Sequence, residues 1–314
     1  SDEEREAILD EIRADDDVTA SMEAVETMAD ISFGEETRSS YMVVASDADS
    51  LEDFVKLRDR KTQEAYQLDD SGVIITEKLA SLLDVGVGDT VTITEGDRDP
   101  VQVKVTHVAE NYFYHYVYMT PEVYRQLYGE DPEYTEIFTI NTADDEAFER
   151  QFQSRYMDIP GILNVTFLSS MAERVADMLR SMDTIIYVVI IAAGLLAFVV
   201  LYNLNNINIS ERRRELATLK VLGFYDIEVS QYVFRENVIL TVIGAAAGVL
   251  IGLVLHRFVI LTAEVDMMMF GRNIKFVSFL YSILLTFLFS MLVNVFMHFQ
   301  LKKLNMVESM KSVE

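Results

Sequence analysis

The stretch SERRRELATLKVLGFYDIEVSQYVFRE, residues 210–236, is charged and amphipathic and lies between two long apolar runs. Arg212, Arg213 and Arg214 come just after the first run, and Arg235 and Glu236 come just before the second. A helix of about 20 apolar residues is long enough to cross a bilayer, so the runs predict membrane spans. The stretch is therefore expected to be a short loop on one face of a membrane, and we interpret it as a contact surface for a partner on that face.

The two parts of this 314-residue chain differ sharply in charge. Residues 1–180 contain 41 Asp and Glu against 15 Lys and Arg, whereas residues 181–314 contain 10 against 11. All of the formal net charge of −25 therefore comes from the first part. This division predicts an acidic soluble domain followed by a domain buried in lipid. It argues against nucleic acid as a partner, because nothing in the acidic part neutralises phosphate.

The periodicity of the first part predicts an α+β domain with helices interleaved among short strands. Thr76 and Thr120 are expected to cap helices, and Pro121 is expected at the first helical position of the second. Residues 19–33 are ambiguous between helix and strand. Helices are predicted at 1–13, within 76–89 ahead of a turn at Gly86 and Gly88, at 121–129 and at 144–156. Strands are predicted at 41–45, 72–76, 90–94, 101–108, 136–141 and 162–168.

Four tyrosines alternate with other residues between Tyr112 and Tyr118. In a strand this alternation would put Tyr112, Tyr114, Tyr116 and Tyr118 on one face. Such a face is either a ligand platform or an ordinary sheet face that is covered by a helix or partly wetted through the hydroxyls. The second interpretation is favoured, because aromatic residues are common in strands.

No Gly or Pro interrupts the sequence between Ser170 and the apolar run at 185–201, which predicts one continuous helix from Ser170 to about Asn206. Its first half would stand outside the membrane as a stalk. In the next apolar run, Gly244, Gly248 and Gly252 recur every four residues, a spacing that allows close helix packing. The predicted segments are an outer domain at 1–168, a stalk at 169–184, spans at 185–206, 238–262 and 276–300, a cytoplasmic loop at 207–237, an external loop at 263–275 and a tail at 301–314.

The distribution of basic residues predicts the orientation of the spans. Eight Lys and Arg lie in the 203–237 loop and the tail, whereas five lie near the spans on the other side. Because cytoplasmic loops carry an excess of Lys and Arg, the central loop is expected in the cytoplasm and the acidic domain outside the cell. The sequence begins SDEEREAILDEI, without an initiator Met or a signal peptide, so we expect it to be the C-terminal piece of a longer chain.

No motif in the sequence predicts catalysis, a bound cofactor or a metal. The chain has no cysteine, which excludes disulfides and thiolate sites, and no G-x-x-x-x-G-K-[ST], which excludes ATP binding by a P-loop. His107, His115, His256 and His298 are scattered, without the spacing of a zinc site. The acidic runs at 15–17 and 95–99 lack the ligand and glycine spacing of a calcium loop. Asn294, in the third span, is expected to make a packing hydrogen bond.

Together these residues resemble a known family. SERRRELATLKVLGF, followed by FREN, a Gly-rich span, a third span and the ending VESMKSVE, resembles the C-terminal module of FtsX-like ABC transporter permeases, which include the MacB-type exporters. The segment GVIITEKLASLLDVGVGDTVTI, residues 72–93, is similar to part of the extracytoplasmic core domain of that family. The resemblance is to the last module of long permeases of Gram-positive bacteria. It implies that the α+β outer domain is MacB-core-like. The residues of this chain predict that an all-α membrane domain of three transmembrane helices follows it.

The resemblance also implies how the chain would work. A separate ABC ATPase, which binds the ATP, would dock on the cytoplasmic loop, and a second permease module in the same or another chain would complete the assembly in the plasma membrane. The family module has four spans, so the first would lie before Ser1. The residues implied to couple to the ATPase are Glu211, Arg212, Arg213, Arg214, Glu215, Leu216, Leu219, Lys220, Leu222 and Gly223.

The sequence leaves more than one function open. The leading hypothesis is a permease subunit without catalysis of its own, which transmits ATP-driven motion through the stalk for export or extraction of an envelope substrate. A second is a regulator that activates an envelope enzyme or senses cationic peptides without transport, since the acidic outer domain would attract cations. A membrane-embedded hydrolase has little support, because no span carries paired catalytic groups. The helix between the first two spans either lies on the lipid headgroups or docks into another protein.

Overall fold

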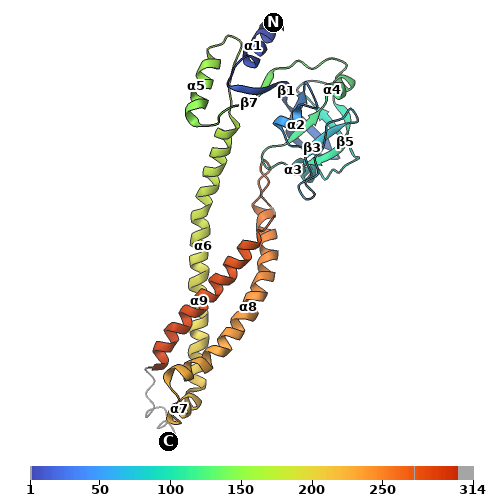
Figure 1. The fold of residues 1–314 in the computed structure, drawn as a ribbon. Helices are drawn as coiled ribbons and strands as arrows, with labels where there is room; N and C mark the ends of the chain where they lie inside the picture. The colour runs from blue at the N-terminus through green and yellow to red at the C-terminus, as the bar shows by residue number, and fades with distance from the viewer. Residues whose placement is uncertain (1, 272, 303–314) are drawn as a thin grey trace. The chain divides into compact units, whose positions relative to one another are not determined.

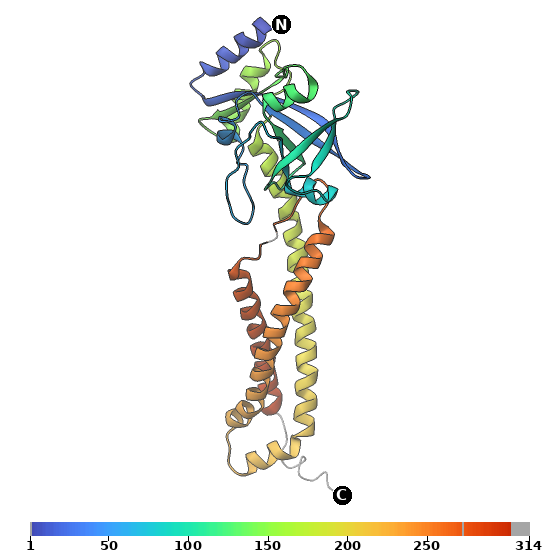
Figure 2. The same ribbon diagram turned by 90° about the vertical axis from the view of Figure 1, so that its right-hand side faces the viewer.

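A computed structural model describes residues 2–271 and 273–302 of the chain (Figures 1 and 2). These residues form two compact units. The first, which we call the sheet domain, contains Ser1–Ser170 and Ala263–Gly271, and the second, the helical unit, contains Met171–Thr262 and Arg272–Glu314. The predicted tail at 301–314 falls largely outside the described residues.

The sheet domain is built on one long antiparallel strand, β1 (Val18–Phe33). Along one edge β1 pairs with β2 (Glu36–Ala45), and along the other it pairs with β4 (Thr90–Thr94) and β7 (Glu136–Asn141). The sheet order β2-β6-β3-β5-β4-β1-β7, together with the β1–β2 pairing, closes six of the strands into a ring. The other members are β3 (Val73–Thr76), β5 (Val101–Ala109) and β6 (Tyr116–Met119). The α+β class predicted from the sequence is confirmed.

Alternation of side chains along the strands creates two hydrophobic clusters, one on each face of the sheet. The larger cluster includes Ile31, Met42 and Ile75 and is completed by Leu79 and Leu83 of helix α3 (Glu77–Leu83) and by Val123 of helix α4 (Pro121–Tyr128). The smaller cluster lies on the opposite face, under helix α2 (Leu51–Phe54) and the chain that follows it. The sequence left residues 19–33 ambiguous, and the structure assigns them to a strand because β2, β4 and β7 all pair with them.

A third cluster joins the first helix to the end of the domain. Ile12 of α1 (Asp2–Arg13) packs with Phe152 and Tyr156 of α5 (Glu146–Met157). The strand predicted at 162–168 is wrong, because these residues pair with no other strand of the described chain. Ile162, Val165 and Phe167 pack against this cluster instead. An alternating apolar pattern is the same whether an extended segment pairs with a sheet or covers a helix.

The caps predicted for α3 and α4 differ in outcome. The Thr120 hydroxyl accepts a hydrogen bond from Val123 N at 3.1 Å, and Pro121 begins α4 as predicted. Thr76 precedes α3 but makes no capping bond, because its hydroxyl accepts from Tyr116 N of the neighbouring strand instead. The sequence pattern identifies the residue that precedes the helix. Whether its hydroxyl accepts from the helix or from a neighbouring strand depends on the folded sheet.

The helical unit contains three helices that are long and apolar enough to cross a membrane. The chain runs as one 44-residue helix, α6 (Leu168–Glu211), which is about 66 Å long at 1.5 Å per residue (Figure 1). The continuous helix predicted from Ser170 is thereby confirmed, and it extends beyond the predicted end at Asn206. The others are α8 (Asp226–Ala263) and α9 (Phe276–Lys302), and the short helix α7 (Arg213–Val221) lies between α6 and α8.

Candidate functional site

Helix α7 is held against the long helices by leucines that the sequence analysis assigned to a partner. Leu216 is only 2% exposed and packs with Ile209 of α6, Val229 of α8, and Val293 and Met297 of α9. Leu219 is partly buried against the same cluster. The packing gives both side chains a structural role, and the ATPase contact predicted for them stays a prediction. An amphipathic helix has one apolar stripe, and here most of that stripe faces the protein's own core.

Gly223 lies just after the end of α7. Gly223 has a φ of +96°, a conformation that side chains with a Cβ rarely adopt, and Phe224 N donates to Leu219 O at 3.2 Å. Tyr225 N then donates to the Glu228 carboxylate at 2.8 Å, which satisfies a backbone group at the start of α8. The turn between the helices is therefore defined by its own hydrogen bonds.

Four large apolar side chains on this turn are exposed, although they lie between the candidate spans and outside them. Leu222 is 70% exposed and Tyr225 is 76% exposed, and Val221 and Phe224 are also exposed. We call Val221, Leu222, Phe224 and Tyr225 the exposed apolar turn. Of these, sequence reasoning identified only Leu222. The signal was the run VLGFY, in which four large apolar residues surround the glycine that ends the helix.

The charged residues predicted for this loop have different surroundings. Arg212 forms an ion pair with Glu236 of α8 at 3.0 Å, so this arginine braces the loop. Glu211, Arg214 and Glu215 are exposed. The side chains of Arg213 and Lys220 lie outside the described residues.

Glycine packing in the helical unit occurs at a different place from the one predicted. A Cβ at Gly194 of α6 would lie 2.3 Å from Cζ of Phe289 on α9, so α6 and α9 approach closely only because this residue is glycine. At Gly244, Gly248 and Gly252, no neighbouring atom of the described chain lies within 4 Å of the point that a Cβ would occupy. Their packing partner is therefore not among the described residues, and the predicted role of these three glycines stays a prediction.

Polar side chains join α8 and α9 in a ladder of three contacts. Ser230 Oγ lies 2.9 Å from His298 Nδ1, Asn237 Nδ2 donates to Asn294 Oδ1 at 3.1 Å, and Thr241 Oγ lies 2.9 Å from Ser290 Oγ. In an apolar medium such bonds hold helices together, because separation would leave the polar groups without partners. The packing hydrogen bond predicted for Asn294 is confirmed.

Replacing Asn294 with leucine is expected to destabilise the α8–α9 pair by about 1 kcal/mol, because the Asn237 amide loses its partner in an apolar setting. The measurement is unfolding of the purified chain in detergent. The double variant Asn237→Leu with Asn294→Leu should recover part of the loss, because no amide is then left unpaired. Thr286→Leu, at an exposed position of α9, is the control. Equal stability of Asn294→Leu and the wild type would contradict the interhelical role.

The tyrosine pattern at 112–118 is not one strand. Only Tyr116 and Tyr118 lie on β6, where their rings stack at 5.7 Å, and Tyr116 also stacks on Tyr41 of β2 at 5.5 Å. Burial raises the pKa of Tyr116 to about 12, and the nearby Glu26 carboxylate adds to this. Tyr112 and Tyr114 belong to the preceding loop, where Tyr114 has a φ of +58°. The single tyrosine face predicted from the sequence is therefore wrong, because the chain turns before β6 begins.

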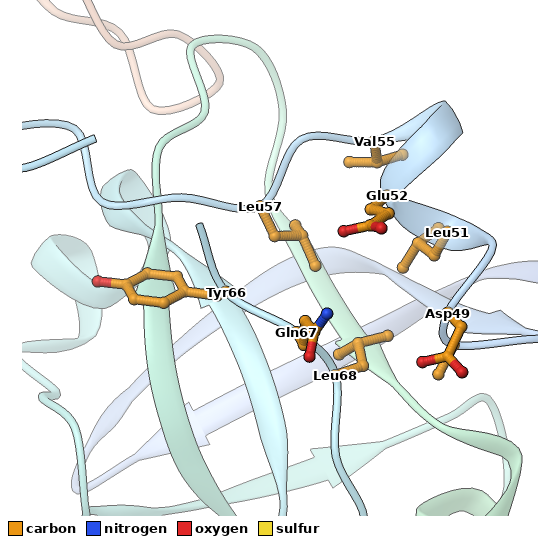
Figure 3. A pocket seen from close by; sticks show the side chains of 9 residues that line it. Asp49, Leu51, Glu52, Val55, Leu57, Tyr66, Gln67 and Leu68 are labelled. Carbon is orange, nitrogen blue, oxygen red and sulfur yellow. The ribbon is translucent and has the colours of Figure 1, made fainter. Parts of the chain in front are cut away.

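A shallow pocket opens beside α2 in the sheet domain (Figure 3). Its space is about 260 Å³, which includes solvent at the mouth, and Leu51, Leu57 and Leu68 in its wall belong to the smaller hydrophobic cluster. Asp49 and Glu52 also line it. Ligand sites are concave and carry a few polar groups placed to fix the orientation of the ligand. The pocket is therefore a depression over core leucines and gives no basis for a substrate site.

His115 of the sheet domain is buried, and its surroundings disfavour its protonated form. Burial lowers the pKa of His115, the positive charges of Lys78 and Arg38 lower it further, and Asp266 acts in the opposite direction. In the folded domain His115 is therefore neutral at pH values where an unfolded histidine, with a pKa near 6.5, binds a proton.

The free energy of unfolding of the sheet domain is expected to fall as the pH drops below about 6.5. His115 has a lowered pKa in the folded domain, so in this pH range the unfolded state binds a proton at His115 more readily than the folded state does. His115→Asn should remove this component. The comparison is urea unfolding of the two chains between pH 7.5 and 5.5, because the difference between them cancels opposing groups such as Glu26, whose pKa is raised by burial. A difference that does not change with pH would show that His115 has no part in the effect.

Among the described residues, no group of three or more His, Cys, Asp or Glu side chains is arranged to hold a metal ion. The features of the helical unit that stand out are instead the exposed apolar turn, the continuous helix α6 and the polar ladder. All three lie in or next to the segment that matches a known family. Residues 187–306 match the family model described as the FtsX-like permease C-terminal domain.

Over residues 187–306 the chain is similar to FtsX-like permeases, and we call this segment the FtsX-like domain. The family resemblance predicted from the loop and the spans is thereby confirmed for this part of the chain. The FtsX-like domain takes in most of α6 and all of α7, α8 and the described part of α9. The exposed apolar turn lies inside it.

Comparison with curated proteins finds no match to the chain. Several solved structures resemble it at low identity. One is the extracellular domain of the noncanonic ABC-type transporter YknZ from Gram-positive bacteria, with 14% identity, 48% of this chain and 83% of that chain covered, and a TM-score of 0.32. Another is the periplasmic region of MacB from Actinobacillus actinomycetemcomitans, with 9% identity, 54% and 80% covered, and a TM-score of 0.34. A permease domain from Porphyromonas gingivalis has 13% identity, 52% and 86% covered, and a TM-score of 0.26.

Proposed function

We propose that the chain is the permease subunit of an ABC transporter, without catalysis or a cofactor of its own, and that a separate ATPase binds the ATP. The motion of the ATPase would pass through the FtsX-like domain to the sheet domain for export or extraction of an envelope substrate. The observation that carries the proposal is the exposed apolar turn, which offers Leu222, Phe224 and Tyr225 to a partner. Such a cluster outside the spans favours a protein or membrane contact.

The topology of the chain supports the direction of this transmission. Helices α6 and α8 are long enough to cross a membrane. If both cross it, the turn between them would be on the opposite side from residues 1–170. The excess of Lys and Arg around this turn favours the cytoplasm for it, and therefore the extracellular side of the plasma membrane for the acidic sheet domain. Helix α6 is a single rod, and it would carry a displacement without a hinge.

A second permease module is proposed to cover the face of α8 that carries Gly244, Gly248 and Gly252. These glycines have no neighbour in the described chain, and their spacing suits a closely packed helix. The partner would be another module of the same protein or a second chain.

A test of the ATPase contact uses the full chain in lipid nanodiscs with the ATPase subunit encoded beside it. Leu222→Asp is expected to abolish co-purification and any stimulation of ATP hydrolysis. The matched control is Val87→Asp, which replaces an equally exposed apolar residue in the sheet domain. Wild-type chain that captures no ATPase, or equal capture by Leu222→Asp, would overturn the proposal. Retention of Leu222→Asp chain on the ATPase with weaker binding to lipid vesicles would assign the turn to the headgroups instead.

A regulator or sensor is the second candidate, and the charge of the first part of the chain favours it. Residues 1–180 contain 41 Asp and Glu against 15 Lys and Arg, and this negative charge attracts cationic peptides to the surface. Salt screens the attraction, so it is strongest at low ionic strength. Binding of such a peptide to the full chain at physiological salt, together with no substrate movement by the assembled complex, would select this candidate over transport.

A further inference from the structure

The segment between α8 and α9 is part of the sheet domain, although the sequence on both sides of it spans the membrane. Residues Ala263–Gly271 belong to the same compact unit as Ser1–Ser170. The chain therefore connects the two units three times, after Ser170, after Thr262 and after Gly271. The sequence predicts only an external loop at 263–275.

Backbone pairing fastens this segment to the loop before β6. Tyr114 N donates to Met267 O at 2.8 Å, and Met269 N donates to Tyr112 O at 3.0 Å. Phe113 and Met268 form the antiparallel bridge between these two bonds. Met268 and Met269 are buried, although Met267 beside them is exposed. The segment thus adds a short paired strand, with buried side chains, to the sheet domain.

A buried ion pair adds to this pairing. Lys78 Nζ on α3 lies 2.9 Å from Glu264 Oε2, and their side chains are only 11% and 2% exposed. The other oxygen, Glu264 Oε1, accepts from Phe270 N at 3.3 Å, which closes the segment on itself. A charge at such a depth is tolerated only with its partner, so removal of either residue leaves the other uncompensated.

The loop that receives the segment is held by side-chain hydrogen bonds and an ion pair. The Asn111 amide donates to Phe113 O at 2.8 Å, and its oxygen accepts from Tyr112 N at 2.9 Å. The Tyr112 hydroxyl donates to Glu110 at 2.5 Å, and Glu110 pairs with Arg58 at 2.9 Å. These bonds hold the loop in a shape that includes the left-handed Tyr114, a conformation that a side chain adopts only when its surroundings enforce it.

We propose that residues 263–271 act as a clasp that makes the α8–α9 hairpin and the sheet domain move together, and that Lys78 and Glu264 are its coupling pair. Work delivered to the FtsX-like domain would then reach the sheet domain through the hairpin as well as through α6. The contacts of the clasp do not depend on the proposed function. Only the use of the clasp in transmitting ATP-driven motion rests on the proposed function. Two attachments instead of one would also prevent free rotation of the sheet domain about α6.

The coupling pair is tested by a double-mutant cycle on the full chain in nanodiscs. Lys78→Met and Glu264→Met are each expected to speed hydrogen exchange at the Tyr114 and Met269 amides by at least about tenfold, because each leaves a buried charge that favours opening. The double variant should recover most of the protection. Arg150→Met, which breaks an exposed ion pair with Glu146, is the control and should leave exchange at these amides unchanged. Unchanged protection in both single variants would overturn the role of the pair.

The clasp itself is tested by an engineered disulfide. The chain has no cysteine of its own, so any bridge that forms must join the introduced cysteines. Phe113 and Met268 form a non-hydrogen-bonded antiparallel pair, whose Cα atoms lie about 4.5 Å apart, within the range of a disulfide. Phe113→Cys with Met268→Cys should therefore oxidise to an intramolecular bridge in membranes. Each single cysteine variant controls for bridges between chains. A folded double variant that forms no bridge would overturn the clasp.

The use of the clasp is tested with the bridged chain and the ATPase. If the hairpin and the sheet domain move together, the oxidised chain keeps the ATPase stimulation and substrate movement of the reduced chain. Loss of both on oxidation, with recovery on reduction, would mean that the clasp opens during the cycle and would overturn the proposal. A wild-type chain that binds no ATPase but still forms the bridge would contradict the proposed function and leave the clasp standing.

Discussion

Replacing Leu216 with aspartate should unfold the α7 region of the helical unit, at a cost of about 4 kcal/mol or more. Leu216 is buried among Ile209, Val229, Val293 and Met297, so the substitution removes a core side chain and places a carboxylate among apolar groups. The loss of a buried leucine alone costs about 2–5 kcal/mol, and an unpaired buried charge adds several more. The expected result is a chain that extracts poorly into detergent and is cleaved by protease at the loop.

The comparison that gives this result its meaning is Leu222→Asp. Leu222 lies six residues further along the same loop but is exposed, so its replacement should leave yield and protease resistance as in the wild type. If both variants lose a partner, only Leu222→Asp identifies a contact, since Leu216→Asp loses it by unfolding. Full stability of Leu216→Asp would contradict the packing of α7 on the long helices.

Replacing Gly72 with alanine should destabilise the sheet domain by about 4 kcal/mol, which is exceptional for the addition of one methyl group. A Cβ at this position would lie 2.1 Å from the backbone oxygen of Lys104, at the edge of the β3–β5 pairing. Backbone atoms of a paired strand do not move aside as a flexible side chain does. The two strands would have to separate, and the ring of strands would open at that point.

The control for Gly72→Ala is Gly86→Ala in the turn after α3. A Cβ at Gly86 would meet only the Asp89 carboxylate, at an ordinary 3.7 Å, and the turn requires no left-handed conformation there. The measurement is urea unfolding of each full chain, followed by tyrosine fluorescence because the chain has no tryptophan. Similar midpoints for the two variants would show that β3 and β5 are not packed at Gly72 as described.

Most elements of the fold follow from local patterns. Strands β4 and β7 begin and end at the predicted residues, because period-two alternation and flanking turn residues mark them clearly. The two errors have different causes. At 162–167 no strand of the described chain pairs with the segment, and no local pattern contains the partner of a strand. At Tyr112–Tyr114 the chain turns before β6 begins, and Tyr114 has a φ of +58°.

The candidate site was predicted only in part, for a related reason. The loop at 210–236 was located by its charges and its flanking spans. Leu216 and Leu219 lie on the short helix α7, whereas Leu222 follows its end. The periodicity of a helix does not say what covers its apolar face. The core of the helical unit takes Leu216 and leaves Leu222 exposed. Phe224 and Tyr225 were missed because they belong to a turn, where no periodicity operates.

Local sequence was enough to establish the division of this protein into an acidic α+β part and an apolar helical part, the uninterrupted helix α6, the glycine that ends α7 and the absence of a P-loop. Each depends on composition or on neighbours within about four residues, which helix and strand periods record. The folded chain was needed to reveal the ring closed by β1, the burial of Leu216, and the clasp, in which Lys78 meets Glu264 across 186 residues. Such contacts depend on the path of the whole chain, because a residue is buried or paired by segments that are distant from it in sequence.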